Sequence, residues 1–121
     1  MVTFNETKRY LMSWTIEFFN EKVKEETFAF PKKILAKTLH IFELVELQGA
    51  NLGMPYTKPL NNGLFEIRAK GEEGIGRSIY CYQKGEVIII LHSFVKKDKK
   101  TPKKDLALAI KRKKELENTK D

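Results

Sequence analysis

Alternation of apolar and polar residues gives the first clear period in this chain. Apolar side chains occupy every second position of residues 14–19, which is typical of a β-strand. Residues 20–30 carry many charges between a few apolar positions and predict a short helix followed by a turn. Residues 1–13 show no such period, so we expect a loose or partly helical leader ahead of one domain over residues 14–121.

A helical period dominates the next segment, from Pro31 to Gly49. Its apolar residues recur at helical spacing, at Ile34, Leu35, Leu39, Ile41, Phe42 and Val45. Pro31 suits the first turn of a helix, and Gly49 readily adopts the left-handed conformation that ends one. Residues 50–63 are punctuated by glycine and proline, so no regular element is expected there.

Three strand-like runs follow, at residues 64–70, 77–83 and 86–95, with turns expected at residues 71–76 and 84–85. Strands this close together in the chain predict an antiparallel meander. The third run is apolar at successive positions, as in a strand that is covered on both faces in the middle of a sheet.

A final helix is predicted to start at Pro102, with Thr101 as its cap. Its inward stripe consists of Leu106, Ala109, Ile110 and Leu116. This order of elements predicts an α+β domain, a small antiparallel β-sheet with helices packed on one side, and we expect one sheet face to stay partly open. The chain has no internal repeat, which indicates a single domain.

Length and composition narrow the classes of protein. The chain has 121 residues, of which 41% are hydrophobic, enough for one ordinary core and too few residues for a separate cofactor domain. Its longest apolar run is far shorter than the roughly 20 residues that cross a bilayer, and its first residues do not resemble a secretory signal, so we expect a cytoplasmic protein with no membrane partner. Cys81 is the only cysteine, which excludes an internal disulfide and a multi-thiolate zinc site.

Most of the net charge lies at the C-terminal end. Residues 1–91 hold 12 Lys and Arg against 11 Asp and Glu, whereas residues 92–121 hold 11 against 5, so the two parts contribute +1 and +6 to the total of +7. A basic C-terminal quarter is suited to phosphates or to an acidic partner. It is equally typical of a well-solvated lysine-rich tail.

Several short motifs occur in a characteristic order. They are Gly63-Leu64-Phe65-Glu66-Ile67-Arg68, then Arg77-Ser78-Ile79-Tyr80-Cys81-Tyr82, then His92-Ser93-Phe94-Val95-Lys96-Lys97 and Thr101-Pro102-Lys103-Lys104. By this order and spacing, residues 14–117 resemble the HigB-type toxins of the RelE/ParE superfamily, in the branch related to a phage-derived protein family.

The resemblance implies a RelE-like fold and the toxin of a type II toxin–antitoxin system. It implies an endoribonuclease that cuts mRNA on the translating ribosome and inhibits translation. The partner that the resemblance implies is a cognate helix-turn-helix antitoxin. We expect no cofactor and no metal, because RNA supplies its own nucleophile, the 2′-hydroxyl.

The chemistry of RNA cleavage indicates which side chains to seek. A site must take the proton of the 2′-hydroxyl, stabilise a charged phosphorane and protonate the leaving 5′-oxygen. Arg68 and Arg77 match basic strand positions of the resemblance, and we expect them to hold the scissile phosphate, since a guanidinium binds two oxygens at once. Without the resemblance, both would be interpreted as surface arginines paired with nearby glutamates.

Four lysines complete the predicted basic cleft. Lys96 and Lys97 follow the central strand and are assigned to the catalytic set, where crowded cations help a lysine to act as a base. Lys103 and Lys104 lie at the start of the last helix and are expected to bind RNA phosphates. Solubility is the competing interpretation. We prefer it for Lys99, Lys100, Lys111 and Lys114.

Tyr80 and Phe94 are candidates for stacking on an unpaired base, with ordinary cross-strand packing as the competing interpretation. Glu66 stands where relatives of the resembled toxins carry a second lysine. Glu66 therefore either acts as a base itself or indicates a weaker active site.

Two histidines complete the candidates. His92 is a candidate for RNA binding, since the ordinary pKa of a histidine lies near neutral pH, but it alternates with Ile88 and Ile90, which favours a half-buried structural role. His40 lies between apolar residues of the long helix and is interpreted as structural.

Two other functions stay open at this stage. One is a gyrase-poisoning toxin of the same superfamily, and the other is a non-catalytic basic adaptor that binds RNA through the last helix. A supercoiling assay detects the first, and salt-dependent RNA binding without cleavage indicates the second.

Overall fold

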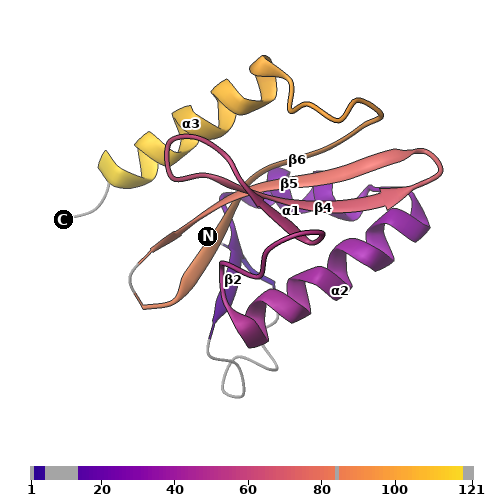
Figure 1. The fold of residues 1–121 in the computed structure, drawn as a ribbon. Helices are drawn as coiled ribbons and strands as arrows, with labels where there is room; N and C mark the ends of the chain where they lie inside the picture. Colours follow the sequence, from indigo (N-terminus) through magenta and orange to yellow (C-terminus); the bar gives the residue numbers. More distant parts are fainter. Residues whose placement is uncertain (1, 5–13, 84, 119–121) are drawn as a thin grey trace.

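A six-stranded, mostly antiparallel sheet forms the centre of the molecule (Figure 1). The computed structural model describes residues 2–4, 14–83 and 85–118. The strands lie in the order β1-β2-β6-β5-β4-β3, and β2 and β6 form the parallel pair. They are β1 (Val2–Thr3), β2 (Thr15–Phe18), β3 (Thr57–Pro59), β4 (Phe65–Gly71), β5 (Gly74–Gln83) and β6 (Val87–Lys96).

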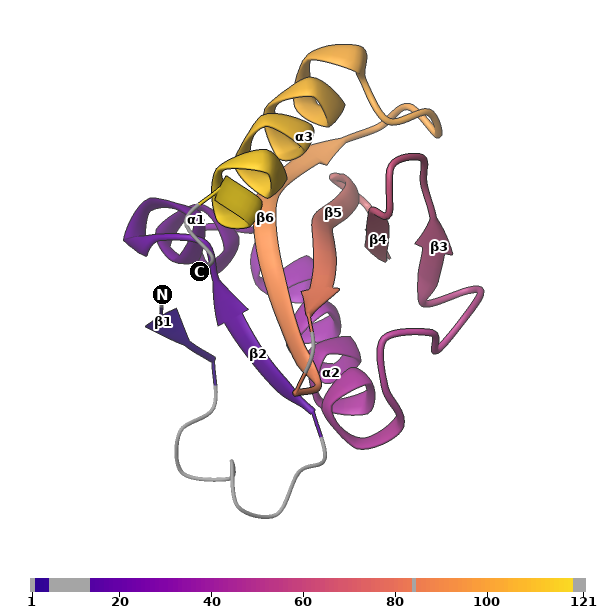
Figure 2. The same cartoon turned by 90° about the vertical axis from the view of Figure 1, so that its left-hand side faces the viewer.

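Helices cover both faces of this sheet. α1 (Glu21–Phe28) and α2 (Lys32–Gln48) pack on one face, and α3 (Lys103–Asn118) lies on the other, as two perpendicular views show (Figures 1 and 2). The predicted α+β class is confirmed. The helices were expected on one side of the sheet, and α1 and α2 do share one side. α3 packs on the opposite face, where it does not cover the β4 end; the site described below lies there.

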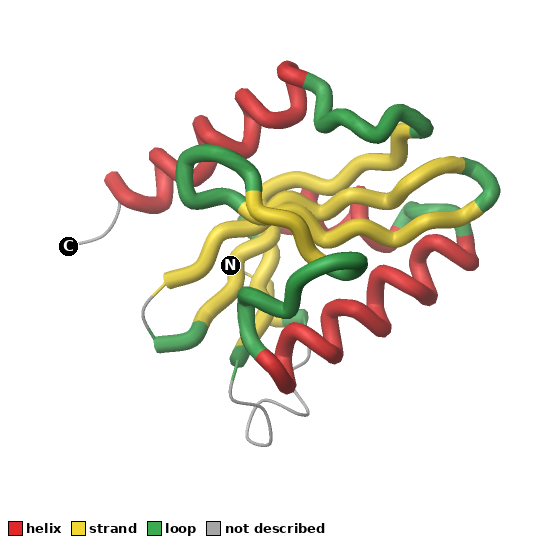
Figure 3. The backbone as a smooth tube through the Cα atoms, viewed as in Figure 1, coloured by secondary structure: helices red, strands yellow, loops and turns green. Residues whose placement is uncertain are grey.

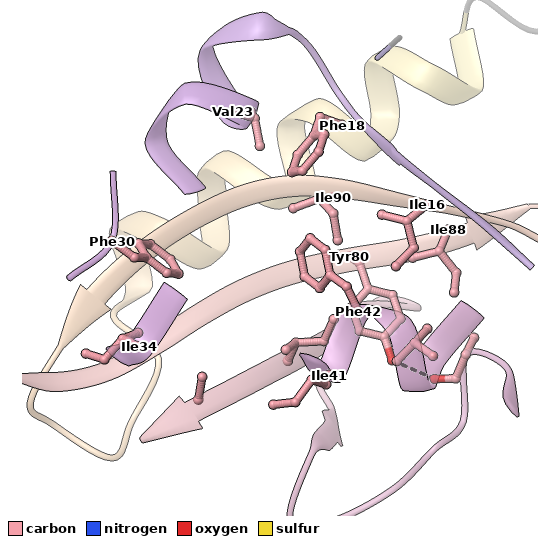
Figure 4. Packing of buried hydrophobic residues seen from close by; sticks show 14 residues of the cluster. Ile16, Phe18, Val23, Phe30, Ile34, Ile41, Phe42, Tyr80, Ile88 and Ile90 are labelled. Atoms are coloured by element: carbon pink, nitrogen blue, oxygen red, sulfur yellow. Dashed lines mark hydrogen bonds between the residues drawn. The ribbon is translucent and has the colours of Figure 1, made fainter. Parts of the chain in front are cut away.

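The larger core lies between the sheet and the first two helices (Figure 4). Ile16 and Phe18 of β2, Ile41 and Phe42 of α2 and Tyr80 of β5 are buried in it. Burial of each such side chain stabilises the fold by about 1.5–3 kcal/mol. The Tyr80 hydroxyl donates a hydrogen bond of 2.6 Å to the carbonyl of residue 50, drawn as a dashed line in Figure 4, and burial raises the pKa of this tyrosine.

The first two helices begin and end where the sequence provides caps. The side chain of Asn20 accepts a hydrogen bond of 2.9 Å from the backbone N–H of Val23, which satisfies a donor at the start of α1. Gly49 ends α2 with φ at 104°, a conformation that glycine adopts without strain.

The smaller core lies under α3. In it, Ala109 and Leu116 of α3 pack against Leu64, just before β4, and against four residues of the sheet, Ile79, Cys81, Ile89 and Leu91. Arg112 fixes the helix further, because its Nη1 donates to the carbonyl of Leu91 at 2.6 Å and its guanidinium lies 5.4 Å above the ring of Phe19. Both packing and this directed hydrogen bond therefore fix the position of α3.

Most of the predicted elements are confirmed, and the differences are local. β3 occupies a segment that was expected to lack regular structure, and β5 begins at Gly74, so the hairpin loop is only Glu72 and Glu73. α3 begins at Lys103, one residue later than expected. β1 falls within the predicted leader, while residues 5–13 lie outside the described residues. Within the described ranges, no helix is long and apolar enough to cross a bilayer.

Candidate active site

Two arginines are direct neighbours across strands β4 and β5. Arg68 of β4 pairs in register with Arg77 of β5, and Arg77 pairs on its other side with Phe94 of β6. Two residues away along β5, Ile79 pairs with Glu66 of β4 on one side and with His92 of β6 on the other. These side chains share the sheet face on which α3 lies, since alternate residues of a strand point to the same face.

A β-bulge in β6 is needed to bring the third strand into this arrangement. Ile79 pairs with His92, yet the next residue, Tyr80, pairs with Ile90, so Leu91 is the extra residue in the ladder. The bulge shifts every later residue of β6 by one position relative to β5.

The alternation of side chains in β6 is reversed after the bulge. The hydroxyl of Ser93 points toward α1, where it lies 2.7 Å from the hydroxyl of Thr27. His92 and Phe94 consequently point toward α3. The prediction that His92 shares the face of the isoleucines before it is therefore wrong, because it counted the alternation through a residue that the ladder skips.

Arg77 is a fully buried cation, with none of its surface exposed. Its Nη1 donates a hydrogen bond of 2.6 Å to the carbonyl of Lys100. Its Nε and Nη2 are buried without a hydrogen-bond partner among the described residues. Burial is the main cause that lowers the pKa of Arg77, and the charge of Glu66 opposes this shift. A guanidinium remains charged at neutral pH even so, and the site therefore holds a buried positive charge with unused N–H donors.

Arg68 and Glu66 form the second half of the site. The Nη2 of Arg68 donates to the carbonyl of Lys99 at 3.0 Å, and its Nε lies 3.5 Å from Oε1 of Glu66. Glu66 is buried, and its Oε2 accepts a hydrogen bond of 2.6 Å from the hydroxyl of Thr101. A carboxylate beside two guanidinium groups reduces their mutual repulsion, which allows two like charges to be cross-strand neighbours.

Residues 97–102 connect β6 to α3 and cover these side chains; we call them the strap. The strap is the loop between the last strand and the last helix in Figure 3. Its backbone carbonyls at Lys99 and Lys100 accept from the two arginines, and its Thr101 hydroxyl donates to Glu66. The acceptors that an anionic ligand would offer to the arginines are thus supplied by the protein itself in this structure.

His92 is held by the first turn of α3. Its Nε2 lies 2.7 Å from Oδ1 of Asp105, and its ring stacks on Phe94 with the centroids 5.2 Å apart. An ionised carboxylate only accepts hydrogen bonds, so Nε2 carries the proton in this contact. The other ring nitrogen, Nδ1, is buried and has no partner among the described residues. A histidine fixed by a carboxylate at one nitrogen and free at the other is arranged for proton transfer.

The predicted lysines lie around this centre and not within it. Lys96, Lys97, Lys103 and Lys104 are exposed, at the end of β6 and the start of α3. Tyr80 is a correction: it is fully buried on the α2 face, so in this structure it is not placed to stack on a base.

Four residues contribute to the site in ways that the sequence did not indicate. Lys99 and Lys100 were assigned to solubility, and their side chains are indeed exposed, but their carbonyls bind the arginines. Asp105 and Thr101 lie in the predicted helix start, and only the fold shows that they reach His92 and Glu66. In the described ranges, no three His, Cys, Asp or Glu side chains are grouped so as to hold a metal ion.

Comparison with known proteins gives one family. The family model described as "Phage derived protein Gp49-like (DUF891)" matches residues 25–114, which include all the side chains of the site. No curated protein matches the chain.

Proposed function

The chain belongs to the Gp49-like family of phage-derived proteins, and from this membership we propose that it is the toxin of a type II toxin–antitoxin pair that cleaves mRNA. The family is related to RelE-type toxins, which are endoribonucleases. The observation that carries the proposal is the buried guanidinium of Arg77, which has unused donors and lies beside a second arginine.

The two arginines are suited to a phosphate in the transition state of RNA cleavage. The 2′-oxygen bonds to phosphorus, the bond to the 5′-oxygen breaks, and the products are a 2′,3′-cyclic phosphate and a 5′-hydroxyl. Arg77 and Arg68 stabilise the extra negative charge on the phosphorane oxygens. Both guanidinium groups are held by strap carbonyls in this structure, so phosphate oxygens have to replace these acceptors before the reaction.

His92 is the best candidate for proton transfer. Its contact with Asp105 fixes the ring and leaves Nδ1 for the substrate, either to take the proton of the 2′-hydroxyl or to protonate the leaving oxygen. Glu66 was considered earlier as a base. It contacts Thr101 and Arg68 instead, and its carboxylate reduces the repulsion between the two arginines. The exposed lysines Lys96 and Lys103 and their neighbours bind the phosphates that flank the cut.

Access to Arg77 requires the strap to move. With no surface exposed, this guanidinium meets a phosphate only after the carbonyl of Lys100 has left it. Phosphate oxygens then take the place of the strap carbonyls, and a charged acceptor forms a stronger hydrogen bond with a guanidinium than a neutral carbonyl does. We propose that binding to mRNA on the ribosome drives this exchange.

The decisive experiment maps the 5′ ends of mRNA by primer extension in a purified translation system. Reactions contain the wild-type protein, Arg77→Met or Arg112→Met, each with and without ribosomes. Arg112 is the matched control, since it is an arginine of the same domain that donates to a carbonyl outside the site. We expect new 5′ ends with wild type and Arg112→Met and none with Arg77→Met, while circular dichroism shows that all three are folded.

The same experiment separates the other functions. Cuts that need ribosomes support the ribosome-dependent activity, and cuts without them indicate a free ribonuclease. An absence of cuts in both reactions contradicts the proposal. A gyrase supercoiling assay then tests whether the protein is a gyrase-poisoning toxin.

An antitoxin is the partner that this function requires. We propose a helix-turn-helix protein encoded beside the toxin, which keeps the cytoplasmic enzyme inactive until it is removed. Restoration of growth on co-expression of the neighbouring gene tests this partner, and unchanged toxicity contradicts it.

A further inference from the structure

A pocket of about 500 Å³ lies outside the arginine site, between α2, β4 and the turn before β3. Its walls include His40 and Lys37 of α2, Met54 and Tyr56 of the turn, and Lys70 of β4. Arg68 and Lys99 also line it, so the pocket adjoins the arginine site and the strap. This volume is in the range of ligand-binding pockets, roughly 300–1,000 Å³.

The pocket exists because β3 covers only part of β4. β3 pairs with Phe65–Ile67, and beyond these residues β4 has no strand partner on its outer edge among the described residues; the carbonyl of Tyr56 accepts there from the N–H of Arg68 at 3.0 Å. A turn closed by the N–H of Gly53 and the hydroxyl of Thr57, 2.7 Å apart, presents the residues between them to solvent. Tyr56 is 38% exposed.

The charges of this pocket have one sign. Its ionisable lining residues are lysines, an arginine, a histidine and a tyrosine, and none of the acidic side chains in the described part of the chain lines it. Lys37 reaches across to β4, where its Nζ donates to the carbonyl of Lys70 at 3.1 Å. His40, interpreted from the sequence as structural, is exposed and lies on this wall. The pocket thus combines an exposed aromatic ring with a rim of cations.

We propose that this pocket binds the nucleotide next to the cleaved bond, with its base on Tyr56 and its phosphate facing Lys37 and Lys70. The inference rests on the proposed function, because it uses the same RNA strand that lies across Arg68. Unpaired bases stack on aromatic side chains, and cations beside the ring bind the backbone. RNA is favoured over an acidic peptide because a base stacks on the ring of Tyr56, whereas carboxylates alone would contact only the cations.

Binding of an oligonucleotide that resists cleavage tests the pocket separately from catalysis. The probe is a fluorescein-labelled 2′-O-methyl RNA hexamer, in the four homopolymer sequences, followed by fluorescence anisotropy. We expect Tyr56→Ala to weaken binding of the best hexamer by about 5- to 100-fold, since one stacked base contributes that much, and Tyr56→Phe to restore it. Tyr82→Ala is the matched control, an exposed tyrosine that does not line the pocket, and we expect it to bind as wild type does.

The lysines give an independent measurement. We expect Lys70→Ala to reduce the slope of log affinity against log salt concentration by about 0.7, the effect of one lost phosphate contact on a single strand. Lys33→Ala, an exposed lysine of α2 outside the pocket, should leave the slope unchanged.

The outcomes separate this inference from the nuclease activity. If wild type cuts mRNA but Tyr56→Ala binds the hexamer as tightly as wild type, the pocket proposal is wrong and the nuclease proposal stands. If Tyr56→Ala loses binding while no condition yields cuts, the pocket binds RNA and the nuclease proposal fails. If wild type binds none of the hexamers, or if polyglutamate displaces them as well as unlabelled RNA does, the nucleotide assignment is overturned.

Discussion

Replacing Arg77 by methionine should make the protein more stable while it removes activity. Methionine keeps most of the volume of the side chain and removes its charge, so the perturbation is mainly electrostatic. The site holds Arg77 fully buried with one hydrogen bond and with two nitrogens that have no partner in the described ranges, which is an unfavourable state for a cation.

The magnitude follows from these contacts. The variant loses one hydrogen bond from a charged donor, which contributes about 1.5–3 kcal/mol, and it relieves two unsatisfied buried donors that cost about 1–3 kcal/mol each. Glu66 loses a nearby positive charge but keeps Thr101 and the guanidinium of Arg68 at 3.5 Å. We therefore expect Arg77→Met to raise the free energy of unfolding by about 1–2 kcal/mol, a Tm increase of about 3–10 °C for a domain of this size.

Urea unfolding followed by circular dichroism measures this change, with Arg112→Met as the control. Arg112 has its hydrogen bond to Leu91 and its contact with Phe19, so the same substitution there should lower the free energy of unfolding by about 1–3 kcal/mol and leave mRNA cleavage intact. A loss of more than about 1 kcal/mol in Arg77→Met at an unchanged m-value would refute the reasoning, because Arg77 would then be a structural tie for the strap.

Three further predictions concern the core and the strap. The pKa of Tyr80 is raised above its unfolded value of 10.0, so its contribution to stability is complete below that pH and is lost as the pH rises further. Urea unfolding should therefore show a falling free energy of unfolding above about pH 10, and Tyr80→Phe, about 1 kcal/mol less stable at neutral pH, should show a smaller fall; equal falls contradict the assignment. Ser93→Ala takes from the buried hydroxyl of Ser78 its partner, while the hydroxyl of Thr27 keeps the carbonyl of Val23, and should cost about 1–3 kcal/mol in the same assay; wild-type stability would exclude this role. Thr101→Val removes the hydroxyl that ties the strap to Glu66. Trypsin should cut the strap lysines faster in this variant at equal global stability, and an unchanged rate would contradict the tie.

Local sequence patterns predicted the helices and most strands because the cause of each is local. The period of apolar residues sets α2, and Asn20 and Gly49 act on their own neighbours. The pairing of Arg68 with Arg77 can also be predicted from the sequence. Once the hairpin loop is placed at Glu72 and Glu73, counting outward along both strands brings the arginines together.

The remaining features depend on contacts between distant segments. The bulge at Leu91 arises from pairing with β5, and no residue type at that position announces it. The strap binds the arginines through carbonyls, which every residue possesses, so lysine side chains at these positions gave no indication. Tyr80 was misassigned because an aromatic residue on a strand does not reveal which face it occupies. Only the burial of that face against α2 decides it.

The bulge at Leu91 also has a consequence for insertions and deletions in this strand. In β6, even-numbered residues face one side of the sheet before Leu91 and the other side after it, because Leu91 is an extra residue in the ladder. Deleting Leu91 would make the ladder regular, with His92 directly after Ile90, so His92 would still pair with Ile79 and still face α3, while the smaller core would lose the buried side chain of Leu91. A one-residue deletion at the bulge therefore keeps the two faces of the strand, whereas a one-residue deletion where the ladder is regular reverses the faces of the residues beyond it.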